Sequence, residues 1–227
     1  MLIAEDLLLL LTDDRTGRLT GSATHVDVAL GGSLLVELAL MDRVALAGPG
    51  EQVREGRVVV RDGSATGDPV LDGALETVRA KQGKKPAQVV TPLGKGLRAQ
   101  LYARLTDRGI LRAERDKVLG VFPSQQWPAV DAEHEDAVRR ELVVVLQQGA
   151  THDARVGALV SLLHALRAVP KVVDPSNAGL SRRELNAHAK QVAEGDWGSA
   201  AVRRAIDEMM AAVVAATTAA TSGAASS

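Results

Sequence analysis

The chain has 227 residues, of which 46 % are hydrophobic and 24 % charged, so it can bury a sizeable core in one large domain or two small ones. Cysteine is absent, which excludes a disulfide framework and thiolate metal sites and suits a reducing cytoplasm. No uninterrupted apolar run approaches the roughly 18 residues of a spanning helix. Glu5 and Asp6 precede the run at 7–11, where a secretory signal would be positive. These features predict a cytoplasmic protein.

The net charge of −1 conceals a strong segregation of charge along the chain. Residues 79–118 carry eleven Lys or Arg against three Asp or Glu, whereas the remainder carries sixteen basic and twenty-five acidic residues. Such segregation points to an anionic partner for the middle of the chain, namely nucleic acid, membrane headgroups or an acidic protein. The alternative is that the acidic remainder folds back on the basic segment.

The first half of the chain predicts three helices and one short strand. A leucine-rich helix opens the chain, and a second is entered through Gly31 and Gly32 and follows the leucines of 33–46. A strand is expected within 54–63, before an Asp-Gly turn signal. Asp68 as N-cap and Pro69 at the first helical position predict the start of the third helix.

The second half predicts a basic helix, a hairpin and further helices. Leucines recur every four residues within 94–111, and the segment 110–131 reads as strand, turn, strand. Helices are expected at about 132–148 and 152–168, after a capping box formed by Ser181 and Glu184, and at about 199–215. We expect a mainly α fold with short β-hairpins, as a single domain over 1–215, followed by a disordered tail over 216–227 that is poor in apolar bulk.

Motifs for chemistry are missing from this sequence. The five histidines form neither His-x3-His nor HExxH, and no G-x-S-x-G, S-x-x-K or Walker loop is present. We therefore expect no catalytic residues, no metal and no cofactor, and we predict a protein that is not an enzyme.

The helix over 94–111 raises a more specific question. At about 100° per residue, Lys95, Arg98 and Tyr102 form an arc beside the leucine stripe. Two cations at this spacing can act as a phosphate clamp, because Arg grips phosphate through paired N–H groups. They can equally be a solvated flank whose aromatic ring covers the leucines. Gly31 and Gly32 leave a similar choice, between exposed N–H groups for an anion and an easy entry into a buried helix.

Four segments, AEDLLLLLTDDRTGRL, ALGGSLLVELALMDRV, ATGDPVLDGALETV and LTDRGIL, occur in an order that resembles the Golgi phosphoprotein 3 (GPP34) family. The resemblance covers roughly residues 1–215 and suggests a bacterial, actinobacterial-like member. It implies a helical domain that binds anionic, phosphoinositide-like headgroups as a peripheral membrane protein. It implies Lys95 and Arg98 as headgroup residues, and together with the arc and the double glycine described above we expect a headgroup site of Lys95, Arg98, Tyr102, Gly31 and Gly32.

The resemblance is incomplete at the headgroup site. The family's lipid pocket also uses a tryptophan and an arginine near the double glycine, and these positions fall at Ser22 and Gly31 here. The resemblance further implies a hairpin for membrane contact or self-association, with Val121, Phe122 and Trp127. Whether that hairpin is exposed or folds onto the domain, and whether it forms a homo-oligomer, is left open.

Two alternatives to lipid binding come from other classes of protein. A helix, a short turn and a hairpin also make the winged-helix pattern, so a nucleic-acid binder could use the same basic segment. A scaffold that binds protein partners through the hairpin is the other alternative.

Overall fold

The structure, a computed structural model, describes residues 1–118, 122–195 and 200–223, and their side chains except at 115–118, 122–124, 200–205 and 220–223. Its elements in chain order are α1 (Ile3–Leu10), α2 (Ala23–Leu40), β1 (Val44–Leu46), β2 (Val58–Val60), α3 (Pro69–Ala80), α4 (Ala87–Gly94), α5 (Leu97–Asp107), β3 (Glu114–Val118), β4 (Phe122–Gln126), α6 (Glu133–Gln148), α7 (Ala154–Ala165), α8 (Val169–Val172), α9 (Pro175–Ala178), α10 (Arg182–Ala193) and α11 (Ala200–Gly223). The fold is mainly α, as predicted.

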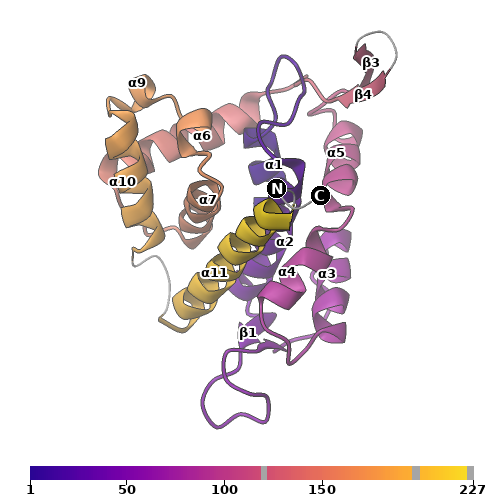
Figure 1. Ribbon diagram of the computed structural model, residues 1–227, viewed down its shortest axis with the longest axis vertical. Helices are drawn as coiled ribbons and strands as arrows, with labels where there is room; N and C mark the ends of the chain where they lie inside the picture. The colour runs from indigo at the N-terminus through magenta and orange to yellow at the C-terminus, as the bar shows by residue number, and fades with distance from the viewer. Residues whose placement is uncertain (119–121, 196–199, 224–227) are drawn as a thin grey trace.

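Helix α2 is the centre of the core. It contacts α1, α3, α4, α5, α7 and α11, and Figure 1 shows it enclosed by them. Its mean hydropathy of 1.4 over 18 residues is high enough for a helix that crosses a bilayer, but 72 % of it is buried inside the protein. Its apolar character is therefore accounted for by the helices packed around it.

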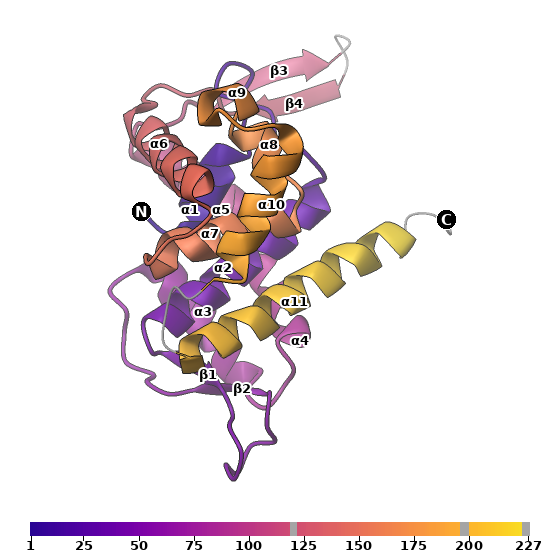
Figure 2. The ribbon, with the colours of Figure 1, turned by 90° about the vertical axis from the view of Figure 1, so that its left-hand side faces the viewer.

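Two antiparallel hairpins lie at opposite ends of the long axis (Figures 1 and 2). In the first, β1 pairs with β2, with Val44 opposite Val60. In the second, β3 pairs with β4, with Glu114 opposite Gln126. The strand predicted within 54–63 and the hairpin predicted within 110–131 are both present.

Capping patterns in the sequence correctly predicted where two helices, α3 and α10, begin. The Asp68 carboxylate accepts hydrogen bonds from the N–H groups of Val70 and Leu71, with Pro69 at the first helical position. Ser181 and Glu184 form the reciprocal capping box at the start of α10. These local bonds are short-range in sequence, which is why the sequence pattern alone was sufficient to predict them.

The last helix is longer than predicted. Helix α11 continues to Gly223, beyond the end expected at about residue 215, while 224–227 lie outside the described residues. Alanine is the best helix former, and Thr217 and Thr218 both donate hydrogen bonds to the carbonyl of Val214. Thr217 is also buried, so this part of the helix has tertiary support that the composition did not reveal.

The double glycine lies within α2 and not before it, because the helix begins at Ala23. A methyl group placed on Gly31 would lie 2.2 Å from the carbonyl oxygen of Val90 and 2.6 Å from the nitrogen of Gly94. One placed on Gly32 would lie 2.3 Å from Cγ2 of Val213. The prediction that this pair opens the helix is therefore wrong: Gly31 lets the α4 backbone approach α2, and Gly32 admits a side chain of α11.

This packing predicts the effect of a single methyl group. Gly31→Ala forces two backbones apart, so its free energy of unfolding should fall by about 1–3 kcal/mol or more. Gly73→Ala is the matched control, because that glycine lies within α3 with no atom near an added methyl group. The control should be neutral or more stable by about 0.5–1 kcal/mol. Urea unfolding of both variants measures the difference, and equal stabilities would contradict the close contact.

Candidate functional site

The junction between α4 and α5 carries the first of the predicted cations. Lys95 has an extended backbone after the end of α4, and Gly96 adopts a left-handed conformation with φ of 74° before α5 begins at Leu97. Lys95 is thus not on the same helix as Arg98, contrary to the predicted arc. Its side chain is exposed and makes no ion pair with any described residue.

The second cation is partly neutralised. The Nε atom of Arg98 lies 2.9 Å from Oδ1 of Asp27, which comes from the second turn of α2. Both side chains are about one third exposed, at 32 % and 35 %. The guanidinium therefore faces solvent in part, but it already has a carboxylate partner that the sequence pattern did not reveal.

Tyr102 belongs to the core and not to the exposed surface. It is 1 % exposed, its hydroxyl is hydrogen-bonded to Oγ1 of Thr12 at 2.9 Å, and burial raises the pKa of its phenol. Its ring stacks on that of Trp127, with centroids 3.9 Å apart and planes 2° from parallel. A direct headgroup contact by Tyr102 is thereby excluded in this structure.

This stack also decides between the two interpretations of the hairpin, as far as its base is concerned. Trp127 is half-buried against Tyr102, and its backbone N–H donates to the carbonyl of Gly17. The base of the hairpin therefore folds onto the domain. Val121 and the side chain of Phe122 lie outside the described residues, so the prediction about the tip remains untested.

Gly31 and Gly32 do not form a surface for an anion, since both are buried inside α2. The contact of Gly31 with the α4 backbone has a second consequence. The resemblance puts the family's pocket arginine at this position, and the space for any side chain there is filled by Val90 and Gly94. In this packing of α2 and α4, an arginine side chain at Gly31 is sterically excluded.

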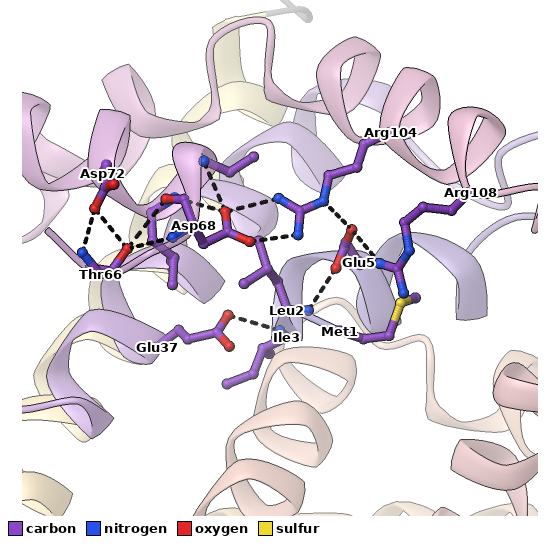
Figure 3. Close-up of polar contacts among 12 residues, drawn as sticks. Met1, Leu2, Ile3, Glu5, Glu37, Thr66, Asp68, Asp72, Arg104 and Arg108 are labelled. Carbon is purple, nitrogen blue, oxygen red and sulfur yellow. Dashed lines mark hydrogen bonds and ion pairs between the residues drawn. The ribbon is translucent and has the colours of Figure 1, made fainter.

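Two further arginines of the basic segment, Arg104 and Arg108, meet carboxylates from the N-terminal part of the chain. Figure 3 shows Arg104 between two acids: its Nε is 2.9 Å from Glu5, and its two terminal nitrogens are 2.8 and 2.5 Å from Asp68. Arg108 reaches the same Glu5 oxygen at 3.2 Å, and the N–H of Leu2 donates to the other at 2.7 Å. The hydrogen bonds from Arg104 are the main cause of the lowered pKa of Asp68.

A second group of charges surrounds the neighbouring carboxylate. Asp6 is 2.7 Å from Nε2 of His134 and 2.6 Å from Arg155, while Arg155 also lies 3.0 Å from Glu37. Burial raises the pKa of Glu37, against the opposing effect of its bond from the N–H of Ile3. Glu5 is fully buried and Asp6 is 4 % exposed, so both need these partners.

These contacts show that the acidic remainder does fold back on part of the basic segment. The charge pattern of the sequence suggests this alternative but does not indicate which residues form the pairs. The available signal was Glu5 and Asp6 within an otherwise apolar helix, since buried acids imply arginine partners elsewhere. Within the residues that the structure describes, no group of three or more His, Asp or Glu side chains is placed to hold a metal ion.

The fold and this surface define a class of protein, namely a helical domain with a β-hairpin whose base folds onto it. The domain carries a partly neutralised pair of cations beside the N-terminal turns of α2 and α5. The family model of Golgi phosphoprotein 3 (GPP34) matches residues 3–209, and the chain belongs to this family. That family is linked in general to membranes as peripheral proteins.

One curated relative is the vacuolar protein sorting-associated protein 74 of Eremothecium gossypii. It is 27 % identical over 164 residues, which cover 63 % of this chain and 48 % of the relative. The match therefore spans about half of the relative's length.

The buried network predicts a large cost for losing one arginine. Arg104→Gln leaves Glu5 with Arg108 as its remaining arginine, and breaking a buried ion pair costs about 3–5 kcal/mol. We expect a fall of about 3 kcal/mol in the free energy of unfolding. Lys190→Gln removes an exposed pair with Glu194 and should change it by less than about 1 kcal/mol. Equal unfolding midpoints for the two variants would show that the network contributes little.

Proposed function

We propose that the chain associates reversibly with anionic membrane surfaces through the cations at the α4–α5 junction. The observation that carries this proposal is the exposed side chain of Lys95, which makes no ion pair among the described residues. It stands next to the N-terminus of α5, where no side chain caps the helix. Free N–H groups and the helix dipole make such an end attractive to phosphate oxygens.

Other groups support the same edge of the molecule. Arg98 is partly exposed one turn away, and Arg18 is exposed on the loop that accepts a hydrogen bond from Trp127. The stack of Trp127 on Tyr102 joins that loop to α5. Each cation near an anionic surface contributes about 1 kcal/mol, so three give weak binding that salt should reverse.

The proposed interaction is attraction to negative charge, and not selection of one inositol phosphate. Discrimination needs several donors converging on one headgroup. Here Ser22 and Gly31 occupy the positions of two family ligands, Tyr102 is buried, and Arg98 is shared with Asp27. We therefore propose binding to anionic lipid in general, with the protein acting as a peripheral, non-enzymatic membrane protein.

The winged-helix alternative receives less support from this geometry. A recognition helix needs cations free to reach DNA, but Arg98 and Arg104 of α5 and Arg108 directly after it all have carboxylate partners. The scaffold alternative depends on the hairpin tip, which lies outside the described residues. Both alternatives are outcomes of the following test.

Vesicle flotation tests the proposal with one reversed charge. The wild-type protein should float with vesicles containing phosphatidylinositol or phosphatidylinositol 4-phosphate, weakly at physiological salt and not with neutral vesicles. The affinity of Lys95→Glu for anionic vesicles should be lower by about tenfold or more, because the substitution changes the charge at this surface by two units. Lys171→Glu, an exposed lysine of α8 without an ion pair among the described residues, should bind as the wild type does.

Absence of flotation at low salt with every vesicle would overturn the lipid proposal. Gel-shift assays with DNA and measurement of the oligomeric state would then address the nucleic-acid binder and the scaffold. Equal loss in both lysine variants would show that total charge, and not this surface, controls binding.

The ion pair of Arg98 gives a prediction in the opposite direction. Asp27→Asn removes a negative charge from the edge and releases the guanidinium from its partner. Binding to anionic vesicles should increase several-fold at low salt, with little change for neutral vesicles. Asp136→Asn, an exposed acid of α6, is the control and should leave vesicle binding unchanged. Weaker binding by Asp27→Asn would instead show that the ion pair is needed to position Arg98.

A further inference from the structure

The N-terminal end of α6 contains a buried acid that takes no part in the proposed membrane surface. Glu135 is 4 % exposed, and its carboxylate accepts a hydrogen bond from Arg139, one turn further along the same helix. Arg139 also donates to the carbonyl of Val172 at 2.7 Å, which fixes its guanidinium from the side of α8. A buried acid is tolerated only where its negative charge is compensated.

A second acid competes for the same arginine. Oδ2 of Asp14, in the α1–α2 loop (residues 11–22), lies 3.8 Å from a terminal nitrogen of Arg139, and its side chain is placed to share a hydrogen bond with that of Glu135. Two carboxyl groups can share a hydrogen bond only when one of them carries a proton. With both ionised, two negative charges face one guanidinium, so one proton makes the group neutral. The geometry therefore defines a place for a single proton.

Neighbouring elements bring charges that are already engaged elsewhere. Helix α1 brings Asp6, whose two oxygens are bonded to His134 and Arg155. The α1–α2 loop also brings Asp13, which accepts hydrogen bonds from the backbone and side chain of Thr16. These local bonds lower the pKa of Asp13, so it remains ionised and adds no proton to the pair.

The other charged groups around α6 lie far along the helix or on the surface. Helix α10 brings His188, whose Nδ1 lies 2.7 Å from the carbonyl of Leu146 near the opposite end of α6. The exposed groups come from the loop, from the start of α6 and from α8 and the residue before α9, and they are Arg15, Arg18, Asp131, Glu133, Asp136, Arg140, Lys171 and Asp174. Glu135 and Asp14 with their shared Arg139 are thus the group that responds to protonation here.

This group is sensitive to pH near neutrality. Burial raises the pKa of Glu135 from its usual 4.5 to about 7, and the charge of Asp14 acts in the same direction, against the opposing effect of Arg139. Because this pKa is higher in the folded chain than in the unfolded chain, the folded state binds the proton more tightly. The contribution of Glu135 to stability is therefore complete below about pH 4.5 and is lost as the pH rises through about 7.

The α1–α2 loop connects this pair of acids to the base of the β3–β4 hairpin. The N–H of Ala129 donates to the carbonyl of Asp14 at 3.0 Å, and the backbone N–H of Trp127 donates to the carbonyl of Gly17 at 2.9 Å. A methyl group placed on Gly17 would lie 2.2 Å from the backbone nitrogen of Trp127, so the two segments are in close contact. Figure 1 shows the loop rising between α6 and the hairpin. Movement of Asp14 away from α6 would therefore disturb the hairpin base.

We propose that the contact between α6 and the α1–α2 loop is a pH-sensitive joint that holds the base of the β3–β4 hairpin. At mildly acidic pH, Glu135 and Asp14 hold one proton between them and the loop is docked on α6. Above neutral pH the proton leaves to solvent and the two carboxylates repel each other. The loop then opens more often, and the hairpin base opens with it.

Urea unfolding of the full chain at about pH 5.5 and about pH 8.5 tests the titration. The wild-type midpoint should be lower at the higher pH. Glu135→Gln keeps the shape of the side chain without its charge and should lose most of that difference, and Asp14→Asn, which removes the repulsion, should reduce it. Glu141→Gln, at an exposed acid of the same helix, is the matched control and should retain it. Equal pH dependence in the wild type and Glu135→Gln would overturn the proposal.

Hydrogen exchange followed by mass spectrometry locates the opening. After correction for the intrinsic effect of pH, peptides covering 11–22 and 125–131 should exchange several-fold faster at about pH 8.5 than at about pH 5.5, and peptides of α2 should not. In Glu135→Gln these segments should exchange alike at both pH values. A pH-dependent midpoint without faster exchange in them would show that Glu135 affects global stability alone, and would overturn the joint. Neither measurement uses lipid, so failure here does not affect the proposed membrane association.

Discussion

The burial of two adjacent carboxylates on the first helix is the constraint on which the rest of the structure depends. Glu5 and Asp6 both lie in α1, whose residues are all buried. An uncompensated buried charge is very costly, so each acid needs a cation with good geometry. Arg104 supplies one from α5 and Arg155 the other from α7. One short helix thereby ties together parts of the chain that are about a hundred residues apart or more.

This constraint changes the meaning of the charge segregation. The charge pattern of the sequence suggested that the basic segment binds an external anionic partner. Arg104 and Arg108, however, form ion pairs inside the protein. What is left for solvent is mainly lysine, at Lys95 and at the connection before α4. The distinction is physical, because arginine satisfies a buried acid through several directed N–H groups, whereas lysine remains strongly hydrated at the surface.

The sequence predicted features that depend on neighbouring residues and missed those that depend on contacts between distant segments. The cap at Asp68 and the capping box at Ser181 are local bonds and were predicted correctly. The sequence predicted that Gly31 marks the start of a helix, although its role is a close contact with α4, about sixty residues away along the chain. Likewise, spacing placed Tyr102 in an exposed arc, but its stacking partner Trp127 comes from beyond the hairpin. No periodicity encodes such partners.

The contact at Gly31 links the packing of the core to the proposed membrane surface. Without a side chain at Gly31, α4 approaches α2 until Gly94 meets the carbonyl of Asp27, where a methyl group would lie only 2.0 Å away. That approach brings the end of α4, and so Lys95, next to the turn of α2 from which Asp27 reaches Arg98. An arginine at Gly31 would require α4 to move away and would disturb this junction. In this chain the close helix contact therefore leaves no space for an arginine side chain at Gly31, and the proposed attraction to negative charge in general requires no side chain there.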